Sequence, residues 1–189
     1  MDSFRWIAVA ISMVLGIGVT RLLSSAVMIL RNRRDFEFDF LPVAWAAFVF
    51  VAQIQFWWSI IELSTTMSVW TLGNFLLLLS MPLLLFVAAA LVLPYEPRKQ
   101  DLALRIGFER DGRLSLLALA LYNALACVAD AVWWSENLLS AQGTMLVALA
   151  ILPLWLFFVS RRPLQISITG LYGLLLIVCE LELTPSSYH

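Results

Sequence analysis

Hydrophobic residues follow one another in six long runs along this chain, and short polar segments separate the runs. The runs cover about residues 4–30, 41–63, 69–93, 114–134, 141–159 and 164–183. Because about 20 apolar residues in a helix cross a hydrocarbon core about 30 Å thick, each run is long enough to span a membrane once. The pattern predicts an all-α integral membrane protein, in which residues 1–189 form a single membrane domain built as a bundle of six transmembrane helices.

Composition supports lipid as the natural solvent of these runs. Hydrophobic residues make up 62% of the chain and charged residues 13%, whereas soluble globular domains have roughly 45–50% and about 25%. The two cysteines, Cys127 and Cys179, lie inside apolar runs and form no CxxC pattern. They are interpreted as small buried residues, with a redox pair as the alternative. The net charge of -1 gives no overall attraction to nucleic acid, so no nucleic-acid partner is expected.

The charges predict the orientation of the bundle. Most Lys and Arg residues lie in the first, third and fifth connections, namely Arg31, Arg33, Arg34, Arg98, Lys99, Arg105, Arg110, Arg113, Arg161 and Arg162. The other two connections, 64–68 and 135–140, contain none. By the positive-inside rule the basic connections, including the long loop 95–113, are cytoplasmic, and both termini are non-cytoplasmic. Tryptophans near the opposite boundary agree with this orientation, since indoles favour the headgroup region: Trp6, Trp57, Trp58, Trp70, Trp133 and Trp134.

Two helical hairpins in the middle of the chain resemble each other. The second run ends in Trp57–Ser59 and the fourth in Trp133–Ser135, and the next helix of each hairpin contains a proline, Pro82 or Pro153. We interpret this as a possible parallel duplication of a hairpin, helices 2–3 and 4–5, with chance as the alternative because Leu and Trp are abundant. Matching prolines would kink both descending helices. Parallel repeats point to alternating-access transporters less strongly than inverted repeats do.

Few polar side chains lie at membrane depth, and each is a candidate for function because a charge there is costly unless it is paired or hydrated. Asp130 stands in an apolar stretch about one turn inside the outer boundary, and Gln53 and Gln55 lie at a comparable depth. With Arg21 they form a candidate intramembrane polar site. Asp130 is either a functional carboxylate or a structural partner of a neighbouring polar side chain, for which the candidates are Asn123, Gln53 and Tyr172.

Arg21 has two interpretations of its own. It is close enough to the inner interface for its guanidinium group to snorkel toward the headgroups. Alternatively it faces the bundle as a buried cation, and Gly16 and Gly18 allow a neighbouring helix to approach closely. Gly170 and Gly173 likewise suit close helix packing or a contact between protomers.

Acidic residues gather near the predicted outer end of the bundle. Together with Asp130, a candidate outer acidic cluster comprises Glu62, Glu136, Glu180 and Glu182. Such a cluster attracts cations or protons, or binds a basic partner. The alternative is that these glutamates are solvated helix ends and that Asp130 alone is buried.

The sequence lacks the motifs of common membrane enzymes. His189 is the only histidine and Lys99 the only lysine, which argues against haem ligation, Ser-His catalysis, HExxH zinc chemistry and a retinal Schiff base. We therefore expect no catalytic residues, no metal and no cofactor. The stretch Gly16–Leu23, followed by a basic connection and a second helix with a Trp-Trp pair, resembles small uncharacterised bacterial inner-membrane proteins. The resemblance covers about three helices and implies no activity.

Two functional hypotheses follow. The first is a non-enzymatic structural or accessory subunit of a membrane complex, assembled with copies of itself as a homo-oligomer or with other membrane subunits. The second is a small channel or carrier for protons, cations or a hydrophobic solute that uses Asp130. The carrier hypothesis predicts one continuous hydrated path past Asp130, Gln53 and Arg21, with the proline kinks as a gate.

Overall fold

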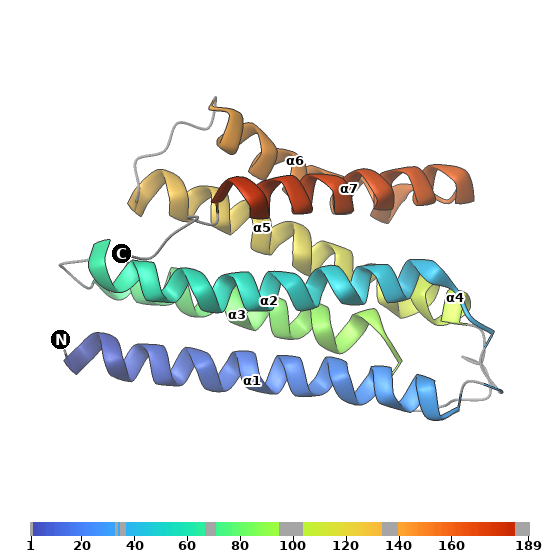
Figure 1. Ribbon diagram of the computed structural model, residues 1–189, viewed down its shortest axis with the longest axis horizontal. Helices are drawn as coiled ribbons and strands as arrows, with labels where there is room; N and C mark the ends of the chain where they lie inside the picture. The colour runs from blue at the N-terminus through green and yellow to red at the C-terminus, as the bar shows by residue number, and fades with distance from the viewer. Residues whose placement is uncertain are drawn as a thin grey trace.

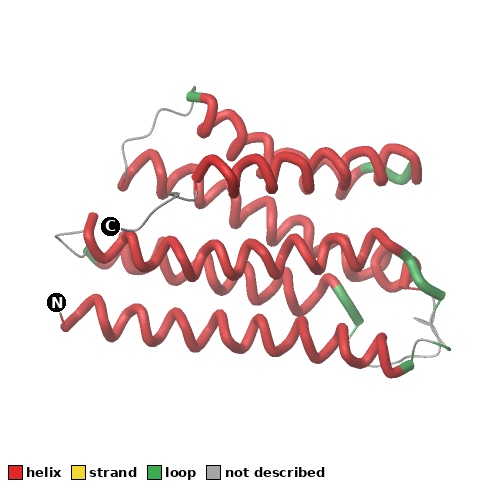
Figure 2. Tube along the Cα trace, viewed as in Figure 1, coloured by secondary structure: helices red, strands yellow, loops and turns green. Residues whose placement is uncertain are grey.

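A computed structural model describes residues 2–32, 34, 37–66, 71–94, 104–133 and 140–183, and the side chains of 2–5, 61–62, 64–66, 141–142 and 182–183 are not described. Every predicted apolar run is a helix, and the described residues contain no β-strand (Figures 1 and 2). The long helices are α1 (Asp2–Arg31), α2 (Phe40–Thr66), α3 (Leu72–Val92), α5 (Arg113–Trp133), α6 (Ala141–Phe158) and α7 (Arg162–Leu183).

Successive long helices run in opposite directions, so α1 begins and α7 ends at the same end of the bundle (Figure 1). Five helical segments are long and apolar enough to span a membrane: α1, α2, α3, the continuous stretch Leu104–Trp133, and α7. The described apolar part of α6, Gly143–Phe158, is shorter. The protein is therefore an all-helical bundle compatible with a polytopic membrane protein.

Helices α3 and α5 occupy the centre of the bundle. α5 packs against α3 and α6, α1 packs against α3 and α2, and α7 packs against α6 and α2. Ala88 and Ala89 of α3 are completely buried, and their small side chains allow close approach of neighbouring helices. Trp45 of α2 and Leu119 of α5 are equally buried and belong to the same hydrophobic core.

Two hydroxyl side chains begin the proline-containing helices. Thr71 precedes α3 and accepts a hydrogen bond from the Asn74 amide at 3.2 Å, and Ser140 precedes α6 and accepts one from the Gly143 amide at 3.0 Å. Each hydroxyl satisfies one of the amides that an α-helix leaves without a partner in its first turn.

The segment 95–113, predicted as a loop, is helical over its second half. α4 (Leu104–Gly107) continues through a π-helical turn, η1 (Phe108–Gly112), into α5. The helix forms because Leu104 and Phe108, four residues apart on one helical face, are both buried against the core. A Cβ atom on Gly112 would lie 2.6 Å from Phe108 Cδ2, so glycine is required where the ring folds back. Residues 95–103 lie outside the described part.

The two ends of the bundle carry different residues. At one end, here called the basic end, lie the last turn of α1, the starts of α2 and α7, and α4 with η1 (Figure 1). The Leu104 amide there donates to the Glu37 carbonyl at 3.3 Å and so joins the first and third connections. Trp6, Trp57, Trp58 and Trp133 belong to helix segments toward the opposite end. The arginines of the basic connections and these four tryptophans of the prediction therefore lie toward opposite ends, while Trp70 and Trp134 lie outside the described residues.

Candidate functional site

Arg21 of α1 contacts the last turn of α3. Its Nη2 donates to the Ala90 carbonyl at 3.1 Å, and its Nη1 donates to the Ser25 hydroxyl one turn along α1. The Ala90 carbonyl is one of the last four of α3, which have no partner inside the helix, and a cation is favourable at a helix C-terminus. Arg21 is half-buried and faces a neighbouring helix, where it caps α3.

Gln53 of α2 lies between α1 and α3. Its side chain is 1% exposed, its Nε2 donates to the Leu85 carbonyl at 3.4 Å, and its Oε1 has no hydrogen-bond partner. The amide fits there because a Cβ atom on Gly18 would lie 2.9 Å from Nε2, whereas one on Gly16 would meet nothing within 4 Å. Only Gly18 therefore allows the close approach that the sequence suggested for both glycines. Gln55 is half-buried.

Asn123 of α5 is a buried amide that the sequence analysis considered only as a partner of Asp130. Its Nδ2 donates to the Leu149 carbonyl of α6 at 3.0 Å and to the Tyr172 hydroxyl of α7 at 3.4 Å. Pro153 follows Leu149 by four residues and has no N–H, so an α-helix cannot satisfy the Leu149 carbonyl itself. Asn123 supplies the missing donor and thereby joins three helices at the proline.

Among the described side chains, Asp130 and Glu180 are half-buried carboxyl groups toward the end opposite the basic end. Asp130 lies on α5 and Glu180 on α7, and both act electrostatically on the buried Tyr122 of α5. The structure thus brings Glu180 into the same region as Asp130. The side chains of Glu62 in α2 and Glu182 in α7, and the whole of Glu136, lie outside the described residues.

The candidate intramembrane residues therefore belong to two different groups. Arg21 and Gln53 contact the second half of α3, whereas Asp130 lies on α5. The rings of Phe56 and Tyr122 pack against each other at 6.2 Å where α2 meets α5. The hydrogen bonds that Arg21 and Gln53 donate to backbone carbonyls, and the one that Arg21 donates to Ser25, are structural contacts.

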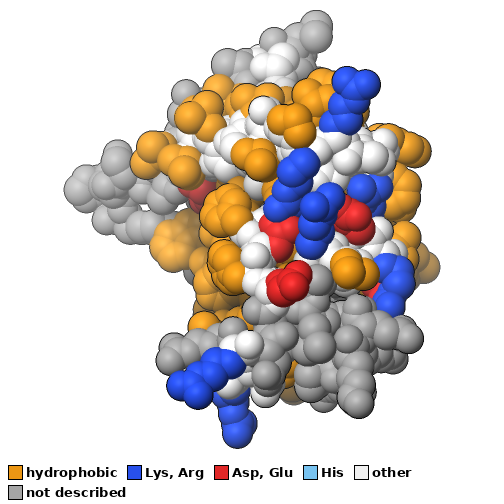
Figure 3. Space-filling view, turned by 90° about the vertical axis from the view of Figure 1, so that its right-hand side faces the viewer, with side chains coloured by type: hydrophobic (Ala, Val, Ile, Leu, Met, Phe, Trp, Pro, Cys, Tyr) orange, Lys and Arg blue, Asp and Glu red, His pale blue; other side chains and the backbone are white. Residues whose placement is uncertain are grey.

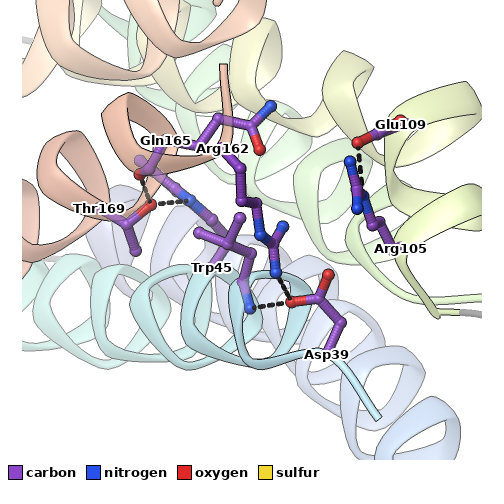
Figure 4. Close-up of polar contacts among 8 residues, drawn as sticks. Asp39, Trp45, Arg105, Glu109, Arg162, Gln165 and Thr169 are labelled. Carbon is purple, nitrogen blue, oxygen red and sulfur yellow. Dashed lines mark hydrogen bonds and ion pairs between the residues drawn. The ribbon is translucent and has the colours of Figure 1, made fainter. Parts of the chain in front are cut away.

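A polar network at the basic end was not predicted. Asp39 is 7% exposed, accepts from the Leu41 amide at 3.0 Å and forms an ion pair with Arg162 (Figure 4). Asp39 immediately precedes α2, where an aspartate commonly caps the first turn, while Arg162 is the first residue of α7. The Asp39 carboxylate therefore caps the start of α2 and holds the start of α7 beside it. The local signal was present, because an aspartate directly before an apolar run is typical of a helix start.

A chain of hydrogen bonds continues this junction into the core. Trp45 Nε1 donates to the Thr169 hydroxyl at 3.1 Å, and this hydroxyl donates to the Gln165 carbonyl at 2.7 Å (Figure 4). The ring of Trp45 packs on those of Tyr172 at 4.7 Å and Phe48 at 5.4 Å. The buried indole N–H thus has the partner that such a group normally needs.

The described residues contain no group of three or more His, Cys, Asp or Glu side chains arranged to hold a metal ion. Cys127 and Cys179 are both buried and form no disulfide. Comparison with protein-family models, with curated proteins and with solved structures finds no match for this chain.

Proposed function

We propose that this protein is a non-enzymatic structural or accessory subunit of a complex in the bacterial inner membrane. One observation carries the proposal: amide and guanidinium side chains inside the bundle donate to backbone carbonyls. Arg21, Gln53, Asn123 and Gln165 each make such a bond. The N–H groups engaged in this way stabilise contacts between and within helices, which is the pattern expected of a scaffold.

The proposed arrangement in the membrane has six spans. α6 is the sixth, because its 18 residues extend about 27 Å, close to the thickness of the hydrocarbon core. The basic end is cytoplasmic under the positive-inside rule, and the start of α1 and the end of α7 face the other side. Cysteine-labelling of Ser160→Cys in sealed inverted vesicles tests this orientation, and labelling only from the opposite face would contradict it.

We further propose that α2–α3 and α5–α6 are copies of one hairpin. Both descending helices begin after a hydroxyl residue that caps the helix, and both bury their proline. Several positions aligned on the prolines have the same exposure class: Leu78 and Leu149, Met81 and Leu152, and Leu85 and Leu156 are buried, while Leu83 and Leu154 are exposed. This agreement supports a common origin, although any two helices packed on one face share part of it.

Native mass spectrometry after mild extraction from the source membrane tests the accessory role. Stoichiometric association with other membrane subunits is the expected result. A protein that leaves the membrane only as a monomer or homo-oligomer would contradict the role in a larger complex. Asp130→Asn serves as a second readout, because a scaffold should retain its partners when this carboxylate is neutralised.

A carrier for protons or cations is the second candidate, and a specific observation favours it. Two half-buried carboxyl groups, Asp130 of α5 and Glu180 of α7, lie toward the same end of the bundle, and ionisable groups at membrane depth commonly mark ion pathways. In liposomes a carrier shows a flux that Asp130→Asn abolishes. Equal flux in the wild type, in Asp130→Asn and in protein-free liposomes would eliminate this candidate.

A further inference from the structure

Arginines at the basic end fall into two classes. Arg162, Arg105 and Arg110 form ion pairs with Asp39, Glu109 and Asp111 respectively. Four other arginines of this end make no ion pair or side-chain hydrogen bond within the described part of the chain: Arg31, Arg34, Arg113 and Arg161. Arg113 is half-buried at the start of α5, whereas the other three are exposed.

The two classes occupy different places on the end face. Seen from this end, blue and red side chains alternate in the middle, while further blue side chains stand apart at the lower left and at the top (Figure 3). The lower edge is the end of α1, which carries Arg31 and Arg34, and the upper edge is the connection from α6 to α7, which carries Arg161. Arg31 and Arg34 at one edge and Arg161 at the other are here called the perimeter arginines, and none of them forms an ion pair within the described residues. Glu37, also exposed at this end, has no ion pair with any of them.

Each perimeter group stands beside exposed apolar side chains. Leu30, next to Arg31, is 67% exposed, and Phe158, three residues before Arg161, is 72% exposed. In a membrane-spanning bundle such side chains contact acyl chains, and the neighbouring guanidinium groups lie at the depth of the headgroups. This combination of an unpaired cation with an apolar surface is complementary to a phospholipid that carries net negative charge.

We propose that Arg31 with Arg34, and separately Arg161, bind the headgroups of anionic phospholipids of the surrounding bilayer. A guanidinium group donates two parallel hydrogen bonds to a phosphate, and none of these three forms an ion pair with a carboxylate of the described residues. The paired arginines of the centre are already neutralised. This inference requires that the bundle be embedded in a bilayer, but it holds whether the protein is an accessory subunit or a carrier.

Native mass spectrometry of the purified protein tests the inference. Equimolar phosphatidylglycerol and phosphatidylcholine are added, and the ratio of the two lipids retained is measured. The wild type is expected to retain phosphatidylglycerol preferentially. Because each arginine near a membrane surface contributes about 1 kcal/mol, the preference should fall about fivefold for each arginine removed in Arg31→Gln/Arg34→Gln and in Arg161→Gln.

Arg105→Gln/Arg110→Gln is the matched control, because it removes the same net charge as the double variant but from paired positions. It is expected to keep the wild-type preference. A wild type that retains both lipids equally would overturn the proposal. An equal loss in the control would also overturn it, since the preference would then reflect net charge alone. Arg161→Gln, which is fully separate in position, repeats the test if the double variant fails to fold.

Discussion

The two halves of the bundle, α1–α3 and α5–α7, contain the same structural features, but their buried amides form hydrogen bonds of different geometry. Each half has a helix with an internal proline, a buried amide that donates to a backbone carbonyl, and a glycine that receives a side chain from another helix. In the second half, Asn123 bonds at 3.0 Å to the carbonyl that Pro153 leaves free. In the first half, Gln53 bonds at 3.4 Å to Leu85, and its Oε1 has no partner.

The difference shows that the contribution of a buried amide to the stability of a membrane bundle depends on which carbonyl group it reaches. Pro82 leaves the Leu78 carbonyl without its helical donor in the same way. Gln53 instead reaches Leu85, whose carbonyl can also accept from the amide four residues later in α3. Asn123 thus donates to a carbonyl that has lost its helical donor, which is the repair tested below. Gln53 instead adds a long hydrogen bond and buries an oxygen without a partner. The following predictions test this contrast, beginning with the largest effect.

Asn123→Leu should destabilise the bundle by about 2 kcal/mol, because it leaves the Leu149 carbonyl buried without a donor. The unfolding free energy of wild type and variant is measured in mixed micelles titrated with SDS. Tyr172→Phe is the control: it removes only the 3.4 Å contact to the same amide and should cost less. Equal costs for the two variants would show that the proline carbonyl is not the important partner.

Gly173→Ala should cost about 1–2 kcal/mol through overpacking. Its new Cβ would lie 2.9 Å from Phe48 Cζ, and this ring is held between Trp45 and Tyr172 at 5.4 and 5.2 Å. In Gly18→Ala the close contact is with the end of the flexible Gln53 side chain, and Phe86 Cα lies at an ordinary van der Waals distance of 3.6 Å, so this variant should cost less. Gly170→Ala, where the Cβ meets nothing within 4 Å, is the control in the same helix and should be close to neutral.

Pro153→Ala tests whether Asn123 acts through the proline. Alanine restores an N–H that can bond to the Leu149 carbonyl within α6, so Asn123→Leu should cost about 1 kcal/mol less in this background than in the wild type. The double-mutant cycle is measured in the same micelles. Pro82→Ala combined with Asn123→Leu is the control, and its two effects should be additive. Coupling of equal size at both prolines would contradict the proposed repair.

The sequence predicts the helices well because apolar runs are local features. The six runs and the observed helices agree to within about three residues at most ends, and Trp6, Trp57, Trp58 and Trp133 lie toward the end opposite the basic connections. Contacts between helices could not be predicted in the same way. The spacing of Asn123 and Pro153 indicates no contact, because it depends on how α5 packs on α6. Asp39 could have been identified as a helix cap, but its pairing with Arg162 depends on the position of α7.

The candidate polar site shows the same limit. Asp130, Gln53 and Arg21 were grouped by their depth in the membrane, which the sequence supplies. Depth does not determine which helix face a residue occupies, and here Arg21 and Gln53 face α3 while Asp130 lies on α5 with Glu180 in its region. A shared depth is therefore insufficient to define one site.

Gln53→Leu is the smallest expected change and separates structure from function most clearly. Replacing an amide that makes one long bond and buries an unsatisfied oxygen by an apolar side chain of similar size should leave stability within about 0.5 kcal/mol of the wild type or raise it slightly. Measured beside Asn123→Leu in the same micelles, it should give a clearly smaller loss. A loss as large as that of Asn123→Leu would mean that Gln53 Oε1 has a partner in the membrane, and water or an ion between α1 and α3 would then be required. If Gln53→Leu leaves stability unchanged but abolishes subunit retention or flux, the buried amide of Gln53 serves the function of the protein and not its stability.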